Sequence, residues 1–312
     1  MKHLFMINPV AGGRRGHPID VEIKIREFTD SIDDPYEIYV TKGPMDACWK
    51  IKEEAEKEAE SGGELRIYAC GGDGTLNECA NGAAGYKNAA ITHYPCGTGN
   101  DFLKTFGREN VEDFLDIEAL SKGEVRPIDL IDCNGRYCIN ICSVGIDARI
   151  GTDVHKYSNI PIIGGATGYV VSLIVNVIKG VTQRFRIEVG DYVIDKKITL
   201  ACACNGQYYG GGFNPVPNAN PDDGIMDILI AEPVSRLKVA ALVGKYSKGK
   251  YAENPEIFTY IQAGEMQVTA DREFIIGLDG EAMFGDKVIF KLVPKAVNFI
   301  FPHKIVQKVL QK

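Results

Sequence analysis

The chain is 312 residues long, and its 45% apolar and 25% charged residues are typical of a globular protein, which excludes the disordered and fibrous classes. Its length suggests about two domains. Its formal charge of −7 argues against nucleic acid as a partner, because phosphate binding needs a basic face.

The start of the chain and its cysteines indicate a cytoplasmic protein. The opening apolar run is too short for a secretory signal, and the longest apolar run, residues 169–178, has about half the length of a membrane-spanning helix. The nine cysteines include no CxxC pair, which favours small buried thiols in a reducing compartment. The alternative is a zinc site with Cys138, Cys142, Cys202 and Cys204 as ligands.

In the first 126 residues, strand-like apolar runs alternate with helix-like runs. We expect strands over residues 3–7, 36–40, 65–70 and 89–93, and helices over 18–32, 45–60 and 76–84. This alternation predicts a parallel, doubly wound, Rossmann-like α/β domain that binds a nucleotide.

The pattern changes between residues 123 and 127. Short β-like runs separated by turns then predict an antiparallel β-sandwich domain over residues 127–295, interrupted by helices near 167–179 and 235–247. The expected strands are 128–133, 136–142, 184–189, 192–204, 225–231, 257–262, 265–270, 273–278 and 286–293.

The C-terminal tail, residues 296–312, combines an apolar run with a short basic helix-like segment from 303 onward. One interpretation is a membrane-surface element. The interpretation that we favour is a terminal segment that returns to the first domain and packs there, because ten residues bury little area.

A glycine-rich segment, Gly71 to Glu78, leaves the third strand and opens a helix. Backbone N–H groups in such a loop form an anion site, and glycines let phosphates approach closely. Asp73 would repel a phosphate unless a cation bridges them, which implies Mg²⁺. The alternative is a plain β-to-α turn in which Asp73 and Thr75 cap the helix.

Two further glycine-rich loops, residues 8–13 and 95–102, also follow strands. Loops at the carboxyl ends of parallel strands meet at one crevice, so the three loops together predict a bound nucleotide. Neither the P-loop motif nor the dinucleotide fingerprint is present. The loop residues expected to contact the nucleotide are Asn8, Pro9, Gly12, Gly71, Gly72, Asp73, Gly74, Thr75, Asn77, Thr98, Gly99, Asn100 and Asp101.

The segment Gly277-Leu278-Asp279-Gly280-Glu281 contains an Asp-Gly hairpin signal. It reads equally well as a tight turn with two solvent-exposed carboxylates and as a hairpin tip that presents a catalytic acid. Phosphoryl transfer needs such a carboxylate to accept a hydroxyl proton.

Taken together, the segments 71–78, 95–102 and 277–281 resemble the bacterial diacylglycerol kinase family, which is related to sphingosine kinases and NAD kinases. The resemblance covers nearly the whole chain and implies ATP and Mg²⁺ as cofactors. It assigns nucleotide contacts to Asn8, Thr41, Gly72, Gly74, Thr75 and Thr98.

The resemblance also assigns the chemistry. It implies that Glu281 is the general base, with Asp279 beside it as a further catalytic residue, and that Asp73 and Asp129 belong to the metal and water network. The turn from Asn220 to Ile225 resembles a structural Mg²⁺ loop, in which Asp223 supplies its carboxylate while Asn220 and Ile225 supply carbonyl groups.

The expected function is that of an ATP-dependent lipid kinase in phospholipid metabolism, which converts diacylglycerol to phosphatidic acid. Such an enzyme visits the membrane surface peripherally, with residues 161–179 as the first candidate contact. An exposed sheet edge could pair two copies in a homodimer. The alternatives are a kinase of a soluble substrate such as NAD, and a nucleotide- or lipid-binding module without turnover.

Overall fold

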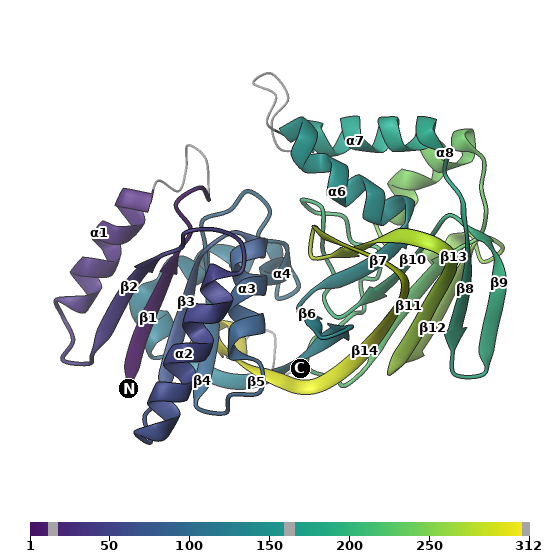
Figure 1. The fold of residues 1–312 in the computed structure, drawn as a ribbon. Helices are drawn as coiled ribbons and strands as arrows, with labels where there is room; N and C mark the ends of the chain where they lie inside the picture. Colours follow the sequence, from purple (N-terminus) through teal and green to yellow (C-terminus); the bar gives the residue numbers. More distant parts are fainter. Residues whose placement is uncertain (12–17, 159–165, 308–312) are drawn as a thin grey trace. The chain divides into compact units, whose positions relative to one another are not determined.

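A computed structural model describes residues 1–11, 18–158 and 166–307 (Figure 1). The chain forms two compact units: unit 1 contains Met1–Asp129 and the stretch that begins at Pro294, and unit 2 contains Leu130–Val293. The chain leaves unit 1 within β5 (Glu124–Cys133) and returns to it within β14 (Glu281–Phe301).

Unit 1 alternates strands and helices along the chain. Its elements before β5 are β1 (Lys2–Ile7), α1 (Pro18–Thr29), β2 (Tyr36–Val40), α2 (Asp46–Glu60), β3 (Leu65–Gly71), α3 (Asp73–Ala83), β4 (Ala89–Pro95), α4 (Asp101–Lys104), the 3-10 helix η1 (Arg108–Leu115) and α5 (Ile117–Ser121).

The sheet of unit 1 is parallel, with strand order β2-β1-β3-β4 followed by the end of β14. The strand order reverses between β1 and β3: the chain runs from β1 outward to β2 on one side, and from β3 outward to β4 on the other. This is the arrangement of a doubly wound fold, and it confirms the predicted α/β class of the N-terminal part.

Side chains on β1 alternate between two helical layers. The rings of His3 and Phe5 contact Phe28 of α1, with centroid distances of 5.8 and 6.3 Å. Lys2 points the other way, and its Nζ donates to Glu54 of α2. Strand residues buried on both faces explain why β1, β3 and β4 read as continuous apolar runs.

The returning C-terminal segment completes unit 1. Asn298 and Phe299 of β14 pair in parallel with β4, and Phe299 packs against Phe102 with ring centroids 5.5 Å apart. At the end of α9 (His303–Ile305), the side chains of Ile305 and Val306 are buried. The described part of the tail therefore packs within unit 1, and residues 308–312 lie outside the described residues.

Unit 2 consists mainly of antiparallel strands with three longer helices. Its elements are β6 (Arg136–Cys138), β7 (Ile141–Gly145), α6 (Ile146–Ser158), α7 (Ala166–Lys179), β8 (Gln183–Val189), β9 (Tyr192–Ile198), β10 (Leu200–Cys204), β11 (Met226–Ala231), α8 (Arg236–Tyr246), the 3-10 helix η2 (Tyr251–Glu253), β12 (Phe258–Ala263) and β13 (Glu265–Leu278).

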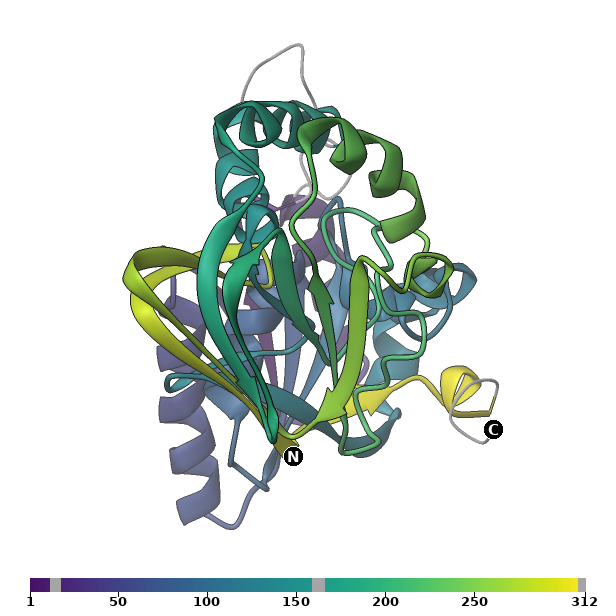
Figure 2. The same cartoon turned by 90° about the vertical axis from the view of Figure 1, so that its right-hand side faces the viewer.

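Strands β7, β10 and β11 lie at the centre of unit 2 and are buried on both faces. Ala201 and Ala203 of β10 join one core, in which β8, β13 and β14 also take part, whereas Leu200 and Cys202 join a second core under α6 and α8. Figure 2 shows α6, α7 and α8 together at one end of this sheet. The predicted C-terminal sandwich is thus confirmed.

All cysteines except Cys96 are buried, and all nine are free thiols. Of the helices that the structure describes, none is both long and apolar enough to cross a membrane.

Four charged side chains form a network at the amino ends of β1 and β2. The Nζ atoms of Lys2 and Lys50 donate to Glu54 at 2.5 and 2.8 Å and to Glu37 at 2.9 and 2.8 Å. Burial raises the pKa of Glu54, but the hydrogen bonds from Lys2 and Lys50 outweigh burial and lower this pKa to about 2.

The Glu54→Gln substitution should lower the free energy of unfolding at pH 7 by about 1–3 kcal/mol, because two partly buried lysines lose a charged partner. A carboxylate with a lowered pKa stabilises the fold above its ordinary pKa and loses this contribution as pH falls toward about 2. The difference between wild type and variant in chemical denaturation should therefore shrink below pH 4.5. Glu22→Gln, at an exposed pair with Arg26, is the control and should change little. A difference that stays constant with pH would contradict the assignment.

Candidate functional site

The loops that follow β1 and β3 are tied together at the point where chain order reverses. Asn8 donates its backbone N–H to the carbonyl of Cys70 at 3.1 Å and its side-chain Nδ2 to Thr75 Oγ1 at 3.0 Å. The N–H of Thr41, after β2, donates to the carbonyl of Ile7 at 2.9 Å. The backbone after Asn8 turns at once, since Val10 N–H donates to Asn8 Oδ1, and Pro9 lies within this turn. Gly12 lies outside the described residues.

A single carbonyl group joins the loop after β3 to the loop after β4. The oxygen of Gly71 accepts the N–H groups of Cys96 at 2.8 Å and Gly97 at 3.1 Å, and lies 3.0 Å from Nε2 of His93. Burial lowers the pKa of His93 to about 4, so its ring is neutral near pH 7 and donates through Nε2. The buried Nδ1 atom has no hydrogen-bond partner among the described residues.

The carboxylate of Asp73 forms a second link between the same loops. Its Oδ1 accepts the N–H of Asp101 at 2.6 Å and that of Phe102 at 3.4 Å, at the start of α4. Asp101 in turn accepts a hydrogen bond from Lys104 at 2.5 Å and is buried. Asp73 therefore holds the loop after β4 against the start of α3.

Close approach explains the glycines of these loops. A Cβ atom on Gly97 would lie 2.5 Å from the Cα of Gly72, and one on Gly99 would lie 2.7 Å from Asp73 Oδ2. A Cβ on Gly71 would meet Thr75 Oγ1 at 2.2 Å. Gly74 differs, because a Cβ there would meet no atom within 4 Å. The backbone is thus closely packed at three of these glycines and open at Gly74.

The start of α3 can take up an anion. Its N-cap residue Gly72 provides no side-chain cap, so the first-turn N–H groups point out of an uncapped helix end. Thr98 is exposed, whereas Thr75 and Asn77 are buried, and Asn77 accepts hydrogen bonds from Asn81 Nδ2. Asn100 has a φ of 50° and donates Nδ2 to the carbonyl of Gly97 at 2.9 Å, which shapes the turn.

Asp129 lies on β5 at the end of unit 1. Its carboxylate is buried, and Oδ1 accepts the N–H of Lys295 at 2.8 Å. A buried carboxylate is costly unless it has partners, and the N–H of Lys295 is one such partner of Asp129.

The predicted Asp-Gly turn joins β13 to β14 as a two-residue hairpin. Asp279 and Gly280 have φ angles of 48° and 90°, and Leu278 pairs with Glu281 across the turn. The Asp279 carboxylate accepts the N–H groups of Ile139, Asn140 and Ile141 at 2.8 to 3.0 Å. Glu281 is partly exposed and forms an ion pair with Arg136. Asp279 therefore fixes the turn, and Glu281 is the carboxylate that the turn presents.

The Asn220–Ile225 segment forms a turn in which Asp223 Oδ1 accepts the N–H of Ile225 at 2.9 Å. Asp223 is exposed. Among the residues that the structure describes, no three His, Cys, Asp or Glu side chains gather to hold a metal ion. A metal site built from these described residues would therefore use single carboxylates together with carbonyl groups, water or substrate oxygens.

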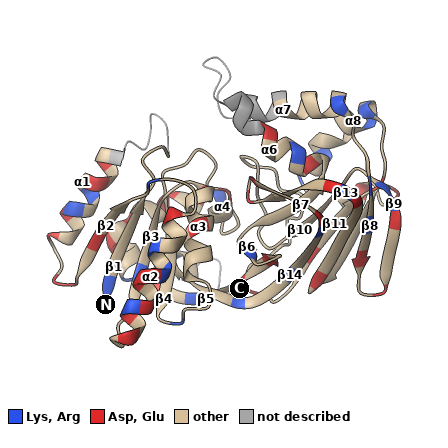
Figure 3. Cartoon of the chain, viewed as in Figure 1, with Lys and Arg blue, Asp and Glu red and all other residues tan. Residues whose placement is uncertain are grey.

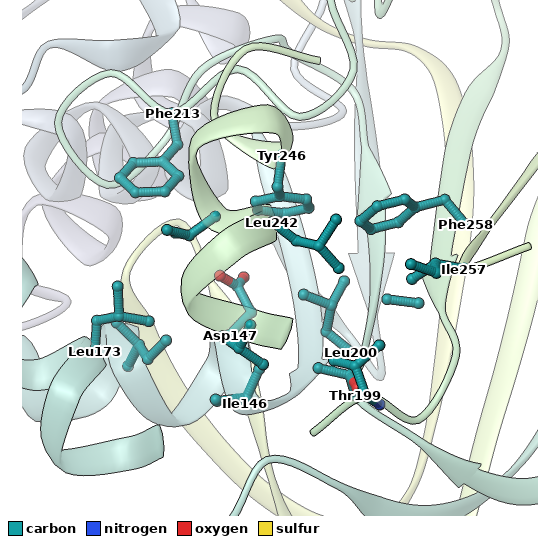
Figure 4. Close-up of a pocket in the computed structure, with 15 residues that line it drawn as sticks. Ile146, Asp147, Leu173, Thr199, Leu200, Phe213, Leu242, Tyr246, Ile257 and Phe258 are labelled. Carbon is teal, nitrogen blue, oxygen red and sulfur yellow. The ribbon is translucent and has the colours of Figure 1, made fainter. Parts of the chain in front are cut away.

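Unit 2 contains an apolar cavity between its sheet and the helices α6, α7 and α8. The cavity offers about 530 Å³ of empty space, part of it open to solvent, and its walls include Leu173, Leu242 and Phe258. In Figure 4 the carboxylate of Asp147 points into the space framed by Phe213, Tyr246 and Leu173.

Asp147 is the polar exception in this wall. Its Oδ1 accepts the hydroxyl of Tyr209 at 2.5 Å, and that hydroxyl lies 3.0 Å from the hydroxyl of Tyr246. Burial raises the pKa of Asp147, although hydrogen bonds from Tyr209 and Ser143 favour its charged form. Sequence reasoning missed Asp147 and also His93. For Asp147 the available signal was a lone acidic residue within the apolar stretch 137–150.

Comparisons with known proteins agree with this architecture. Residues 2–133 match the diacylglycerol kinase catalytic domain, and residues 140–301 match the YegS C-terminal NAD kinase beta sandwich-like domain. The chain is 27% identical over 246 residues to a protein of Shewanella frigidimarina named "Probable lipid kinase YegS-like", covering 76% of each chain. A protein of the same name from Pseudomonas aeruginosa is 28% identical over 247 residues, covering 79% of this chain and 80% of the relative.

A solved structure from Bacillus anthracis, described as "A putative diacylglycerol kinase", superimposes with a TM-score of 0.74 at 25% identity and covers 98% of both chains. The chain belongs to the diacylglycerol kinase and YegS family of lipid kinases, a phosphotransferase family. Members of the family that carry this catalytic domain typically use ATP.

The contacts between the two loops predict the effect of one methyl group. Gly97→Ala should lower the free energy of unfolding by about 1–3 kcal/mol, because the new Cβ would overlap the backbone of Gly72. Gly74→Ala is the matched control: its Cβ meets no atom, and alanine favours a helix, so its melting temperature should equal or exceed that of wild type. Equal melting temperatures for both variants in calorimetry would show that the loops are not in contact.

Proposed function

We propose that the protein transfers the γ-phosphoryl group of Mg-ATP to a hydroxyl group of a membrane lipid, with diacylglycerol as substrate and phosphatidic acid as product. The observation that carries the proposal is the pair of glycine loops after β3 and β4, held together by the Gly71 carbonyl and the Asp73 carboxylate beside an uncapped helix end. Such an arrangement suits a polyphosphate.

The nucleotide would be held by unit 1. Backbone N–H groups in the first turn of α3, together with the hydroxyls of Thr75 and Thr98, are the donors for phosphate oxygens. The open space at Gly74 supports this assignment, because phosphate can approach the backbone where no Cβ intervenes. Asn8 and Thr41 flank the same edge, since both bond to the ends of β1 or β3.

Mg²⁺ would neutralise charge that develops on the transferred group. It prefers hard oxygen ligands and is usually bound through one or two carboxylates plus substrate phosphates. The residues that would hold it are Asp73 and Asp129. For a second, structural Mg²⁺, the donors would be the Asp223 carboxylate and the carbonyl groups of Asn220 and Ile225.

Glu281 would act as the general base. In the proposed step its carboxylate accepts the proton of the lipid hydroxyl, the lipid oxygen forms a bond to the γ-phosphorus, and the bond from that phosphorus to the ADP oxygen breaks. The three N–H groups on Asp279 support a rigid turn, so Asp279 positions Glu281. Arg136 forms an ion pair with the Glu281 carboxylate, which holds this side chain at the turn.

The aliphatic part of the lipid would lie in the apolar cavity of unit 2. Its apolar walls fit hydrocarbon chains better than they fit a charged, water-soluble acceptor. The natural substrate lies in a bilayer, so the proposal includes a cytoplasmic protein that binds the membrane surface peripherally.

A panel of acceptors tests the proposal directly. The full chain is incubated with ATP labelled at the γ-phosphate and, in separate reactions, with micellar diacylglycerol, phosphatidylglycerol, a sphingoid base or NAD. We expect label in the diacylglycerol product. Label in NAD alone would show that the substrate is soluble and not a lipid. ATP binding without transfer to any acceptor would show that the protein is a binding module without turnover.

The Glu281→Gln substitution tests the general base of the chemical step. It should lower kcat with diacylglycerol by at least about tenfold while leaving ATP affinity within about twofold, because only proton acceptance is lost. Asp195→Asn, an exposed carboxylate on β9 that also pairs with an arginine, should retain the activity of wild type. A kcat for Glu281→Gln within about tenfold of wild type would contradict the general-base role.

A further inference from the structure

We infer that the outer surface of α7 and α8 docks onto an anionic membrane, through the aliphatic side chains of Ile174, Ile178 and Leu237 together with the basic side chains of Arg236 and Lys238. This inference rests on the proposed function, since it identifies the surface through which a lipid kinase would reach its substrate. These five residues form the docking surface.

The docking surface exposes large aliphatic side chains. Ile174 is 53% exposed, Ile178 66% and Leu237 86%. Ile174 and Ile178 are four residues apart, so they lie on the same side of α7. A single exposed apolar residue is ordinary, but a group on adjacent helices marks an interaction site.

The two helices are joined where these side chains occur. Arg236, the first residue of α8, donates from Nε to the carbonyl of Val177 at 3.0 Å and from Nη2 to that of Ile178 at 2.8 Å. The start of α8 therefore lies against the last turn of α7, which places Leu237 near Ile178. Figures 1 and 2 both show the two helices side by side.

The inward faces of the same helices already have a role. Leu173 of α7 and Leu242 of α8 line the apolar cavity, and Val177 packs against the core beneath. Packing within unit 2 therefore accounts for Leu173, Val177 and Leu242 but leaves Ile174, Ile178 and Leu237 in solvent. A membrane bound to the outer face of α7 and α8 would therefore lie against the same two helices that cover the cavity.

The charge of the two helices fits an anionic surface. The chain carries a net charge of −7, yet α7 and α8 contain Lys179, Arg236, Lys238 and Lys245 and no acidic residue. Lys179 pairs with Asp153, and Lys245 pairs with Glu253, which leaves Arg236 and Lys238 next to Leu237 as the main positive charge. Figure 3 shows the basic residues of α8 as blue segments.

A lipid surface fits these features better than a protein partner does. Aliphatic side chains beside Lys and Arg match the boundary between acyl chains and anionic headgroups, where apolar burial and electrostatic attraction act together. An interface with a second copy would place the same positive charges against each other, which is unfavourable.

The test measures vesicle binding without ATP, so that it does not depend on turnover. Full-length protein is sedimented with vesicles of phosphatidylglycerol and phosphatidylcholine in equal parts. We expect binding that weakens as salt rises, and the double substitution Ile174→Ser with Ile178→Ser should lower the partition coefficient about tenfold or more. Lys238→Gln should weaken binding to these vesicles but not to pure phosphatidylcholine.

The chain offers a matched control in α1. Ile19 and Ile23 are also four residues apart, with exposed fractions of 59% and 50%, but α1 carries Asp20, Glu22 and Glu27 against Lys24 and Arg26 and so has no net positive charge. Ile19→Ser with Ile23→Ser should bind vesicles within about twofold of wild type. Melting temperatures of both double variants verify that each remains folded.

Distinct outcomes separate this inference from the proposed function. If no lipid gains phosphate but the α7 variant alone loses vesicle binding, the kinase proposal fails and the docking surface stands. If diacylglycerol is phosphorylated but the α7 and α1 variants bind vesicles equally, or wild type binds none, the inference is overturned. It is also overturned if ultracentrifugation shows a dimer that only the α7 variant dissociates, without vesicle binding.

Discussion

One carbonyl group joins the two glycine-rich loops on which the rest of the candidate site depends. The oxygen of Gly71 ends β3 and receives hydrogen bonds from the backbone of Cys96 and Gly97 and from the ring of His93. These bonds hold two chain segments that are about 25 residues apart as one rigid surface at the carboxyl edge of a parallel sheet. Asp73 reinforces the link from the other side, by accepting N–H groups at the start of α4. A neutral, buried His93 can donate at this position without the cost of a buried charge.

This closeness determines which residues the loops can contain. The backbones at Gly72 and Gly97 approach so nearly that no side chain fits between them, while Gly74 faces open space. Glycine therefore has two roles within one motif, close packing at some positions and ligand access at another. In unit 2 the corresponding constraint is the Asp279 carboxylate, whose three backbone donors fix a hairpin with two positive φ angles next to Glu281. Both sites use a carboxylate to hold backbone, which leaves the neighbouring groups in defined positions.

Sequence patterns predicted β1 to β4 and α1 to α3 closely, because alternating strands and amphipathic helices carry strong periodicity, but they did not predict the short helices α4, η1 and α5. The same patterns missed α6, whose sequence contains Gly151 and β-branched residues that favour helix weakly; Ile146 and Ile150 are buried in the core, which stabilises it. They joined β9 and β10 into one run, because no turn residue marks the break near Thr199. The sequence predicted which motif residues belong to the site, but not the hydrogen bonds between them. Asp73 and Asp101 are 28 residues apart in the chain, and no local sequence pattern predicts a contact over that distance.

The measurement that tests this account most directly is hydrogen exchange of the full chain, followed by mass spectrometry, with and without Mg-ATP. If the loops after β3 and β4 form one nucleotide-holding surface, exchange should slow together in the peptides covering residues 71–75 and 96–101. Saturable ATP binding that protects neither loop, or only one of them, would contradict the claim that the Gly71 carbonyl unites them into a single site.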